Sequence, residues 1–513
     1  MTRIKQITLA VAAVLAANAG FASAAQGPSS SQTPYVTAVA PGVQFTSILT
    51  TGDSVGGYRM GGIPDGLGAY DNGNGTMTVL MNHELGATVG INRAHGAKGA
   101  YVSEWVIDKT TLQVQSGSDL MRTVKNTDGS AYTGALTFAR FCSADLPAVS
   151  AFYNPTTGLG TQNRIFMNGE ESGTGVLGAV GNRALAHVAT GADKGTSYYL
   201  SAFGAASWEN VAANGYAQDK TIVVGQSDGT ARVGSSNVSG AVAVYVGNKT
   251  NVGNDAERAG LANGTTYYVN VSGMTQERVN STTINTIAPN ATFTLSTNAA
   301  TSFSRPEDGA WDTQSNNKYY FVTTDQLDTV NDGVGTAVGR SRLYSMTFND
   351  IANPTAGGKI DMLLDGTEGQ VMMDNMTVNE DGTLVFQEDT GNAVHNGKGF
   401  KYDPTTDTLT QIYKSDVTRF GDVVGGVVTT GTLTKDEETS GVIDVTSILN
   451  RNDGKQYNLL VMQNHALSGD AETVEGGQLM LMAQPVPEPE TYAMLLGGLG
   501  LMGFAAKRRR NKK

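Results

Sequence analysis

The sequence predicts an all-β protein, a β-propeller of about six blades with loop insertions. Helical periodicity is scarce along the 513 residues, whereas short runs rich in Tyr, Val and Thr recur between turns rich in Gly, Asn and Asp. Glycine accounts for 64 residues, well above its usual share. Several runs end on acidic residues, and a circular array of sheets would gather such strand ends around one axis. The runs are irregularly spaced, so strand density and acid placement carry this prediction rather than a fixed repeat.

The chain begins with the order of a secretory signal peptide over residues 1–24. Arg3 and Lys5 precede an apolar run that ends near residue 22, and Ala22-Ser23-Ala24 supplies the small residues of a cleavage site. The apolar run is too short and too rich in alanine for a membrane span. No twin arginine is present, so we expect general secretion into an oxidising compartment.

Residues 25–42 are predicted to be a flexible lead-in, because their Ser, Gln and Pro residues offer no apolar period to bury. The propeller is expected over residues 43–484. Its strand-like runs follow in order at 76–81, 101–108, 112–115, 164–171, 198–210, 221–228, 242–247, 319–324, 342–348, 371–389, 399–404, 442–445 and 459–465. The run at 459–465 (LLVMQNH) resembles 79–83 (VLMNH), as expected if the first and last blades meet to close the ring. The stretch 263–300, rich in Asn and Thr, is predicted to be an insertion or an outer-strand region.

Charge and cysteine content narrow the function. The formal net charge is −12, and removing the two cationic residues of segment 1–24 and the net +4 of segment 485–513 leaves −18. This charge disfavours nucleic acid and favours cations as partners.

The single cysteine, Cys142, excludes an intramolecular disulfide, so stability must come from core burial and bound metals. Because Phe141 flanks it and no histidine is near, we expect Cys142 to be a small buried hydrophobic residue rather than a nucleophile.

Acidic residues at strand ends are the main functional signal. In segment 302–325, Arg305, Glu307 and Asp308 precede a strand that ends at Asp325, and segments 371–389, 164–171 and 76–84 repeat this arrangement. Carboxylates supply oxygen ligands for a hard cation, and an arginine fork suits a bound oxyanion. One such segment alone would be a solvated turn between strands. Four of them predict a shared axial site.

The tail, residues 485–513, has three parts. A Pro/Glu linker is followed by about fifteen apolar, Gly-rich residues and then by the basic cluster Lys507-Arg508-Arg509-Arg510. The apolar part is short for a permanent span, so only transient membrane contact is expected. The tail resembles the PEP-CTERM sorting signal, with Pro487-Glu488-Pro489 as its motif. This resemblance implies removal of the tail by an exosortase and export to the cell surface or extracellular matrix of a Gram-negative bacterium.

Six short segments of the body follow one another in a characteristic order: Asn82-His83-Glu84, Asn168-Gly169-Glu170-Glu171, Ser207-Trp208-Glu209, Arg305-Pro306-Glu307, Met373-Asp374-Asn375 and Gln387-Glu388-Asp389. In these segments the body resembles the PhoX family of secreted alkaline phosphatases. The resemblance implies a β-propeller whose axial site holds calcium and iron and hydrolyses phosphate esters. It further implies that Arg305 contacts the phosphate. The metal ligands it implies are Glu84, Glu170, Glu171, Glu209, Glu307, Asp374, Glu388 and Glu438.

One position departs from the family pattern. Gly169 stands where the family has an iron-bridging cysteine, which argues against iron and leaves calcium as the expected cofactor.

Two functions are compatible with these sequence features. The first, which we favour because Arg305 and the acids are present, is an exported metal-dependent phosphoesterase. The second is a non-catalytic calcium-binding propeller of the extracellular matrix, which the missing thiol favours.

Overall fold

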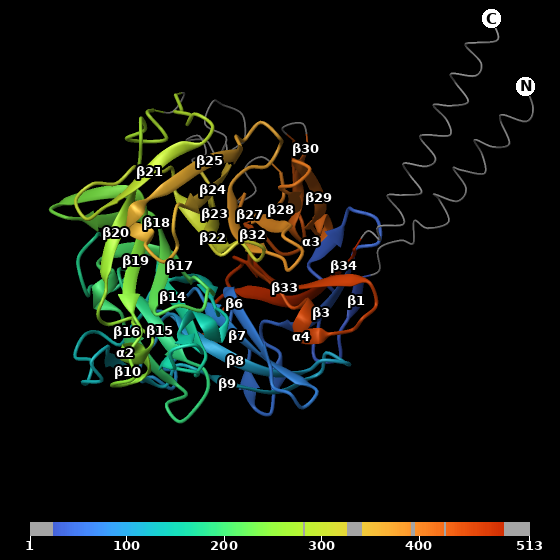
Figure 1. The fold of residues 1–513 in the computed structure, drawn as a ribbon. Helices are drawn as coiled ribbons and strands as arrows, with labels where there is room; N and C mark the ends of the chain where they lie inside the picture. The colour runs from blue at the N-terminus through green and yellow to red at the C-terminus, as the bar shows by residue number, and fades with distance from the viewer. Residues whose placement is uncertain are drawn as a thin grey trace, which may run out of the picture.

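The computed structural model describes residues 24–280, 283–325, 341–390, 395–424, 427–434 and 436–486. Its sheets are arranged around one axis (Figure 1), which confirms the predicted all-β propeller. Among the described residues, six strands form an inner ring, in which each contacts the next and the last contacts the first. They are β6 (Pro64–Asp71), β11 (Phe141–Asp145), β17 (Ala206–Ala213), β22 (Pro306–Trp311), β26 (Met373–Val378) and β32 (Glu437–Asp444).

Each inner strand begins an antiparallel sheet that extends outward. The outer strands of the first three sheets are β7 (Thr76–His83), β8 (Tyr101–Asp108), β9 (Val114–Asp119), β14 (Ile165–Glu170), β15 (Ala184–Val188), β16 (Thr196–Tyr199), β18 (Lys220–Val233), β19 (Ser236–Asn248) and β20 (Thr265–Val271). Those of the last three are β23 (Lys318–Thr323), β24 (Arg342–Phe348), β25 (Gly358–Leu364), β27 (Leu384–Glu388), β28 (Lys398–Asp403), β29 (Thr408–Ser415), β33 (Lys455–Asn464) and β34 (Gly476–Pro485). The sheets of β17 and β22 are joined at their outer edges through β21 (Ala291–Ser296), which pairs with β20 and β25. The stretch 263–300 thus supplies outer strands, one of the two alternatives expected for it.

Smaller elements complete the described chain. Strand β10 (Thr123–Asn126) pairs in parallel with β16, and the short strand pairs are β4 (Ser54–Val55) with β5 (Tyr58–Arg59), β12 (Tyr153–Asn154) with β13 (Leu159–Gly160) and β30 (Asp422–Val424) with β31 (Val427–Thr429). The α-helices are single turns: α2 (Asp255–Arg258), α3 (Val417–Phe420) and α4 (Thr446–Leu449). In the part of the chain that the structure covers, no helix is long and apolar enough to cross a membrane.

The N-terminal segment completes the last blade. Strand β3 (Gln44–Thr50) pairs with β34, β1 (Ala24–Gln26) adds to β3, and β2 (Val36–Ala38) pairs with β29. Pairing of the two ends of the chain in one sheet closes the ring.

The segment expected to be a flexible lead-in is therefore bound to the propeller, and this expectation needs correction. Its Ser30 Oγ lies 2.9 Å from Thr50 Oγ1, and Tyr35 packs edge-on against Phe420. Although this segment has no apolar period of its own, these polar and aromatic contacts and the strand pairing hold it on the propeller. All but the last residue of the predicted signal peptide and nearly all of the predicted tail lie outside the described residues.

The inner strands all run in the same direction along the axis, because the first parts of all six line one cavity and their later parts line another. The second strand of each sheet returns antiparallel. One end of the axis therefore receives the starts of the inner strands and the ends of the second strands. The core lies between neighbouring sheets, where large side chains such as Trp105 and Trp208 are almost fully buried. The axis itself is lined by polar residues, which makes it the place to look for a site.

Candidate metal centre

A β-bulge interrupts each of the six inner strands described above. The pairing register shifts between Pro64 and Leu67, Phe141 and Ala144, Trp208 and Asn210, Pro306 and Gly309, Met373 and Met376, and Thr439 and Val442. A bulge sets two residues against one and re-aims their side chains. As a result, consecutive residues such as Glu307 and Asp308 both reach the axis, each at a different level.

The side chains delivered in this way form one acidic centre at the end where the inner strands start. Five of its acids and its one thiol lie within the bulges or just before them on inner strands, and other acids follow the second strands. Its described lining consists of Asp65, Glu84, Arg140, Cys142, Glu171, Glu209, Arg305, Glu307, Asp374, Asp389 and Glu438. They surround a cavity of about 30 Å³, enough for very few water molecules or ions.

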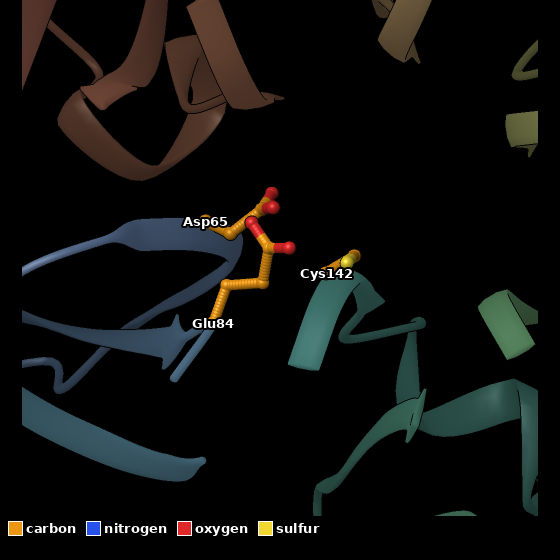
Figure 2. A group of neighbouring side chains, drawn as sticks. All are labelled: Asp65, Glu84 and Cys142. Atoms are coloured by element: carbon orange, nitrogen blue, oxygen red, sulfur yellow. The ribbon is translucent and has the colours of Figure 1, made fainter. Parts of the chain in front are cut away.

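The possible ligand atoms fall into four overlapping groups. These are Asp65, Glu84 and Cys142; Cys142, Glu171 and Glu209; Glu209, Glu307 and Asp374; and Asp374, Asp389 and Glu438. Within each group one ligand atom from every residue lies within 4.8 Å of the others. Figure 2 shows the first group, in which the three side chains converge from β6, from the residue after β7 and from β11. Because neighbouring groups share a residue, the centre can hold several cations in a row.

The carboxylates of this centre need nearby positive charge to stay ionised. Burial, and then the nearby carboxylates, raise the pKa of Glu209 to about 8 and that of Asp389 to about 7. The same causes raise the pKa of Asp65, Glu307 and Asp374 well above the usual range. Acids that repel one another in a buried site keep their charge only if cations lie among them.

Glu438 is the exception among these acids. Burial acts to raise its pKa, but the nearby charge of His465 and a hydrogen bond from Ser440 outweigh burial and lower it. His465 lies 3.6 Å from Glu438 and 2.8 Å from Glu475, and these two carboxylates overcome the effect of burial and raise the histidine pKa to about 11. Glu438 is therefore held ionised by the protein itself.

Two arginines border the centre. Arg140 Nη2 lies 2.9 Å from Glu84 and its Nε lies 2.6 Å from Glu171, while Arg305 Nη2 lies 3.0 Å from Glu307. Half of the Arg140 side chain and 41% of that of Arg305 remain exposed. Both guanidinium groups can therefore meet a ligand that enters from solvent.

The structure corrects the interpretation of Cys142. The thiol is buried, as expected, but it lies among carboxylates and not among apolar side chains, with Sγ 3.6 Å from Glu171 Oε2. Burial and the neighbouring acids raise the pKa of this thiol well above its usual value. Gly169, which we compared with the family's cysteine, is not among the lining residues, and a Cβ built on it would lie 2.2 Å from Trp208 Cβ. A soft ligand is therefore present at the axis, on a different strand.

Seven of the sequence-predicted residues come together in this centre. They are Glu84, Glu171, Glu209, Arg305, Glu307, Asp374 and Glu438. Glu170 and Glu388 lie elsewhere. Glu170 forms a fully buried ion pair with Arg183, and Glu388 accepts hydrogen bonds from His395 Nε2 and from two backbone N–H groups. Glu170 and Glu388 are each the last residue of a strand. Because neighbouring residues along a strand point to opposite faces, the following residues, Glu171 and Asp389, reach the axis instead.

Sequence reasoning did not assign Asp65, Arg140 or Asp389 to the site, and it gave Cys142 a place at the axis only as the less favoured alternative to a buried thiol. A weak repeat could have found Asp65, Arg140 and Cys142. Ile63, Arg140, Arg305 and Met372 all have a left-handed φ between 48° and 56°, and each stands two residues before a lining residue. Such backbone is uncommon for these residue types and concentrates at functional sites. The segment Ile63-Pro64-Asp65 thus corresponds to Arg305-Pro306-Glu307. The segment Arg140-Phe141-Cys142 corresponds to both of them.

Comparisons with known proteins agree with this picture. The PEP-CTERM protein-sorting motif matches residues 485–510. The fold is similar to "Pseudomonas fluorescens PhoX in complex with vanadate, a transition state analogue", with 12% identity and a TM-score of 0.50 over 89% of this chain and 98% of that chain. A luciferin-regenerating enzyme (8% identity, TM-score 0.31, 83% and 94% of the two chains) and a fungal alcohol oxidase of the AA5 family (8% identity, TM-score 0.37, 89% and 78%) are more distant. The sequence matches no curated protein in the comparison.

Fold and centre together define an exported β-propeller with a polar, acidic axis. The sorting motif marks the chain for export, for cell-surface sorting in Gram-negative bacteria and for processing by an exosortase. Its propeller is PhoX-like in fold.

Proposed function

We propose that the protein is an exported metal-dependent phosphoesterase that hydrolyses phosphate esters at the axial centre. The observation that carries the proposal is the four overlapping ligand groups with two half-exposed arginines beside them. Cations in a row and guanidinium forks are the means by which proteins hold a phosphoryl group and stabilise its charge in the transition state. The likeness in fold to PhoX supports the same reading.

The residues present fit the expected metals. Carboxylate oxygens from Asp65, Glu209, Glu307 and Asp374 are the hard ligands that calcium prefers. Cys142 adds a softer ligand, which suits iron or another transition metal, so the argument against iron from Gly169 no longer holds. When bound, such cations would act as Lewis acids toward the phosphoryl oxygens and activate a water molecule.

The chain's own residues bind and orient the ester. Arg305 is held by Asp228, with 2.8 Å between Nε and Oδ1, and by Glu307, so its exposed edge has a fixed direction. Arg140 is held in the same manner by Glu84 and Glu171, which belong to the two ligand groups that share Cys142. We infer that both donate hydrogen bonds to phosphoryl oxygens. The deep burial of the carboxylates limits competing water, which strengthens these contacts.

Hydrolysis of p-nitrophenyl phosphate and of bis(p-nitrophenyl) phosphate tests the proposal. Turnover should require divalent cations, stop on chelation and return with calcium. Arg305→Lys, which loses the fork, should lower kcat/KM by about tenfold or more. Arg232→Lys, on an exposed strand residue, is the matched control and should leave it unchanged.

Two outcomes would count against the enzyme. Absence of chelator-sensitive turnover of either ester from neutral to alkaline pH would remove it. Stoichiometric calcium without turnover would favour the calcium-binding matrix propeller. That alternative is supported by the ion pairs with carboxylates that already occupy both arginines.

A further inference from the structure

A second and larger cavity lies at the opposite end of the axis. Its volume is about 480 Å³, and all six inner strands line it at or beyond their bulges. Each strand contributes at least one side chain, namely Leu67, Asp145, Ala212, Asp308, Met376 and Val442. A cavity of this size accommodates a small organic molecule.

A layer of hydrogen-bonded side chains separates this cavity from the metal centre. Ser143 stands between Cys142 of the centre and Ala144 of the cavity, and Asn375 stands between Asp374 and Met376. Asn375 Nδ2 donates to Ser143 Oγ over 2.6 Å, and Ser143 Oγ donates to Glu209 over 2.7 Å. A ligand in the cavity therefore does not touch the metal centre, and the inference that follows does not rest on the proposed function.

The cavity is strongly acidic. Its lining includes Asp145, Asp308, Asp312, Glu380 and Asp444 and, among the described residues, no lysine or arginine. Lys318 lies 3.8 Å from Asp312, but in the described chain the other four acids form no ion pair. Of these four, Asp308 is buried, Asp145 and Asp444 are partly buried, and Glu380 is exposed. A buried carboxylate without a cationic partner is unusual in proteins.

Of the acids in this cavity, Asp308 is buried and Asp145 is partly buried. Asp308 is held in place by hydrogen bonds from Asn210 Nδ2 and from the backbone N–H groups of Gly309 and Met376. Asp145 Oδ2 accepts the Ala213 N–H over 2.8 Å, whereas none of the described residues donates to its Oδ1. Burial raises the pKa of both carboxyl groups to about 7, and Asp308 adds to the effect on Asp145. Among the described residues, one Asp145 oxygen therefore has no donor, and both carboxylates receive hydrogen bonds but no cationic partner.

The geometry favours an organic cation over a metal ion. Within the described residues, the groups with three ligand atoms close enough for a metal all lie in the other compartment. Here the acids are instead combined with apolar walls, including Leu67, Met376 and Val442, and with Trp311 and Tyr216. Aromatic faces attract ammonium groups, and apolar walls accept methylene groups.

We propose that this cavity is a second binding site, which takes an aliphatic amine whose ammonium group lies against Asp145 and Asp308. Its methylene chain packs on the apolar wall, and a second ammonium group, where present, reaches Glu380 and Asp444 at the partly exposed rim. This site is distinct from the metal centre in ligand, charge balance and location.

Isothermal titration calorimetry with 1,4-diaminobutane tests the proposal on the full mature protein. The diamine should bind with a stoichiometry of one, and 1,4-butanediol, which lacks the charges, should not. Asp145→Asn keeps the acceptor for the Ala213 N–H and should weaken diamine binding by about tenfold or more, because a charge-assisted hydrogen bond is lost. Asp350→Asn, which removes an exposed charge from a turn at the same end of the molecule, is the control and should bind normally.

A second set of measurements separates this site from the metal centre. Glu307→Gln should retain diamine binding, since its side chain lies in the other compartment. A crystal soaked with the diamine should show it against Asp145. Equal affinity of Asp145→Asn and the unaltered protein, loss of binding in Glu307→Gln, or displacement of the diamine by stoichiometric calcium would each overturn the proposal. So would the absence of any diamine binding at millimolar concentration.

Discussion

Removal of divalent cations should destabilise the propeller measurably. At a free cation concentration of 100 times Kd, each bound cation adds about 2.7 kcal/mol to the free energy of unfolding. Unfolding entropy of about 2.1 cal/mol/K per residue, over roughly 460 residues, gives about 1 kcal/mol/K, so each kcal/mol shifts the melting temperature by about 1 °C. The four overlapping groups can hold one to four cations. Chelation should therefore lower the melting temperature by roughly 3 to 11 °C.

Differential scanning calorimetry in calcium, in excess chelator and after calcium is restored measures this shift. The loss should be reversible. Glu307→Gln should show a smaller response to chelator than the unaltered protein, whereas Asp350→Asn should respond fully because its carboxylate is far from the axis. An identical melting curve with and without chelator would refute the reasoning, because the buried acids would then be tolerated without cations.

Three further predictions follow from single residues. Glu307→Gln keeps the shape of the side chain but removes one charge, so metal content should fall and phosphoesterase activity should fall by about tenfold. Elemental analysis measures the metal content, and p-nitrophenol release measures the activity. Unchanged values would show that Glu307 is only a turn residue. Cys142→Ser should lose any transition metal and its visible absorption while it keeps calcium, and an absorption spectrum that the substitution leaves unchanged would show that the thiol is no ligand. The pKa of Asp145 is raised by burial to about 7 from an unfolded value near 4, so the unaltered protein loses stability from this group as pH rises from about 4 to about 7 and Asp145→Asn does not. In urea unfolding, the variant should gain roughly 2 kcal/mol relative to the unaltered protein between pH 5 and pH 8, and equal differences at both pH values would contradict this.

Much of the fold could be predicted from the sequence because strand runs and turns are local signals. The strands at 101–108 and 342–348 have the predicted bounds. The lead-in could not be predicted, because its partners, such as Thr50 and Phe420, are contributed by the folded blades rather than by its own composition. The closing of the ring by β3 and β34 depends in the same way on contacts between distant segments.

The candidate site was only partly predictable for a geometric reason. Strand alternation and bulges decide which of two neighbouring acids reaches the axis, and neither can be recognised in a pair such as Glu170-Glu171 or Glu388-Asp389. The bulge at Phe141 likewise brings Cys142 to the axis, although its flanking residues suggest an ordinary core position. A single thiol cannot be assigned from its neighbours in sequence when its neighbours in space lie on four other strands or directly after them.

The central claim is that the axial acids form a metal centre that holds a phosphoryl group. Anomalous diffraction from crystals of natively purified protein, soaked with inorganic phosphate, tests it most directly. Our account predicts cation peaks within the four ligand groups, one of them next to Cys142 Sγ, and phosphate in contact with Arg305. An axis without cation peaks, or cations and phosphate bound only elsewhere on the molecule, would contradict it.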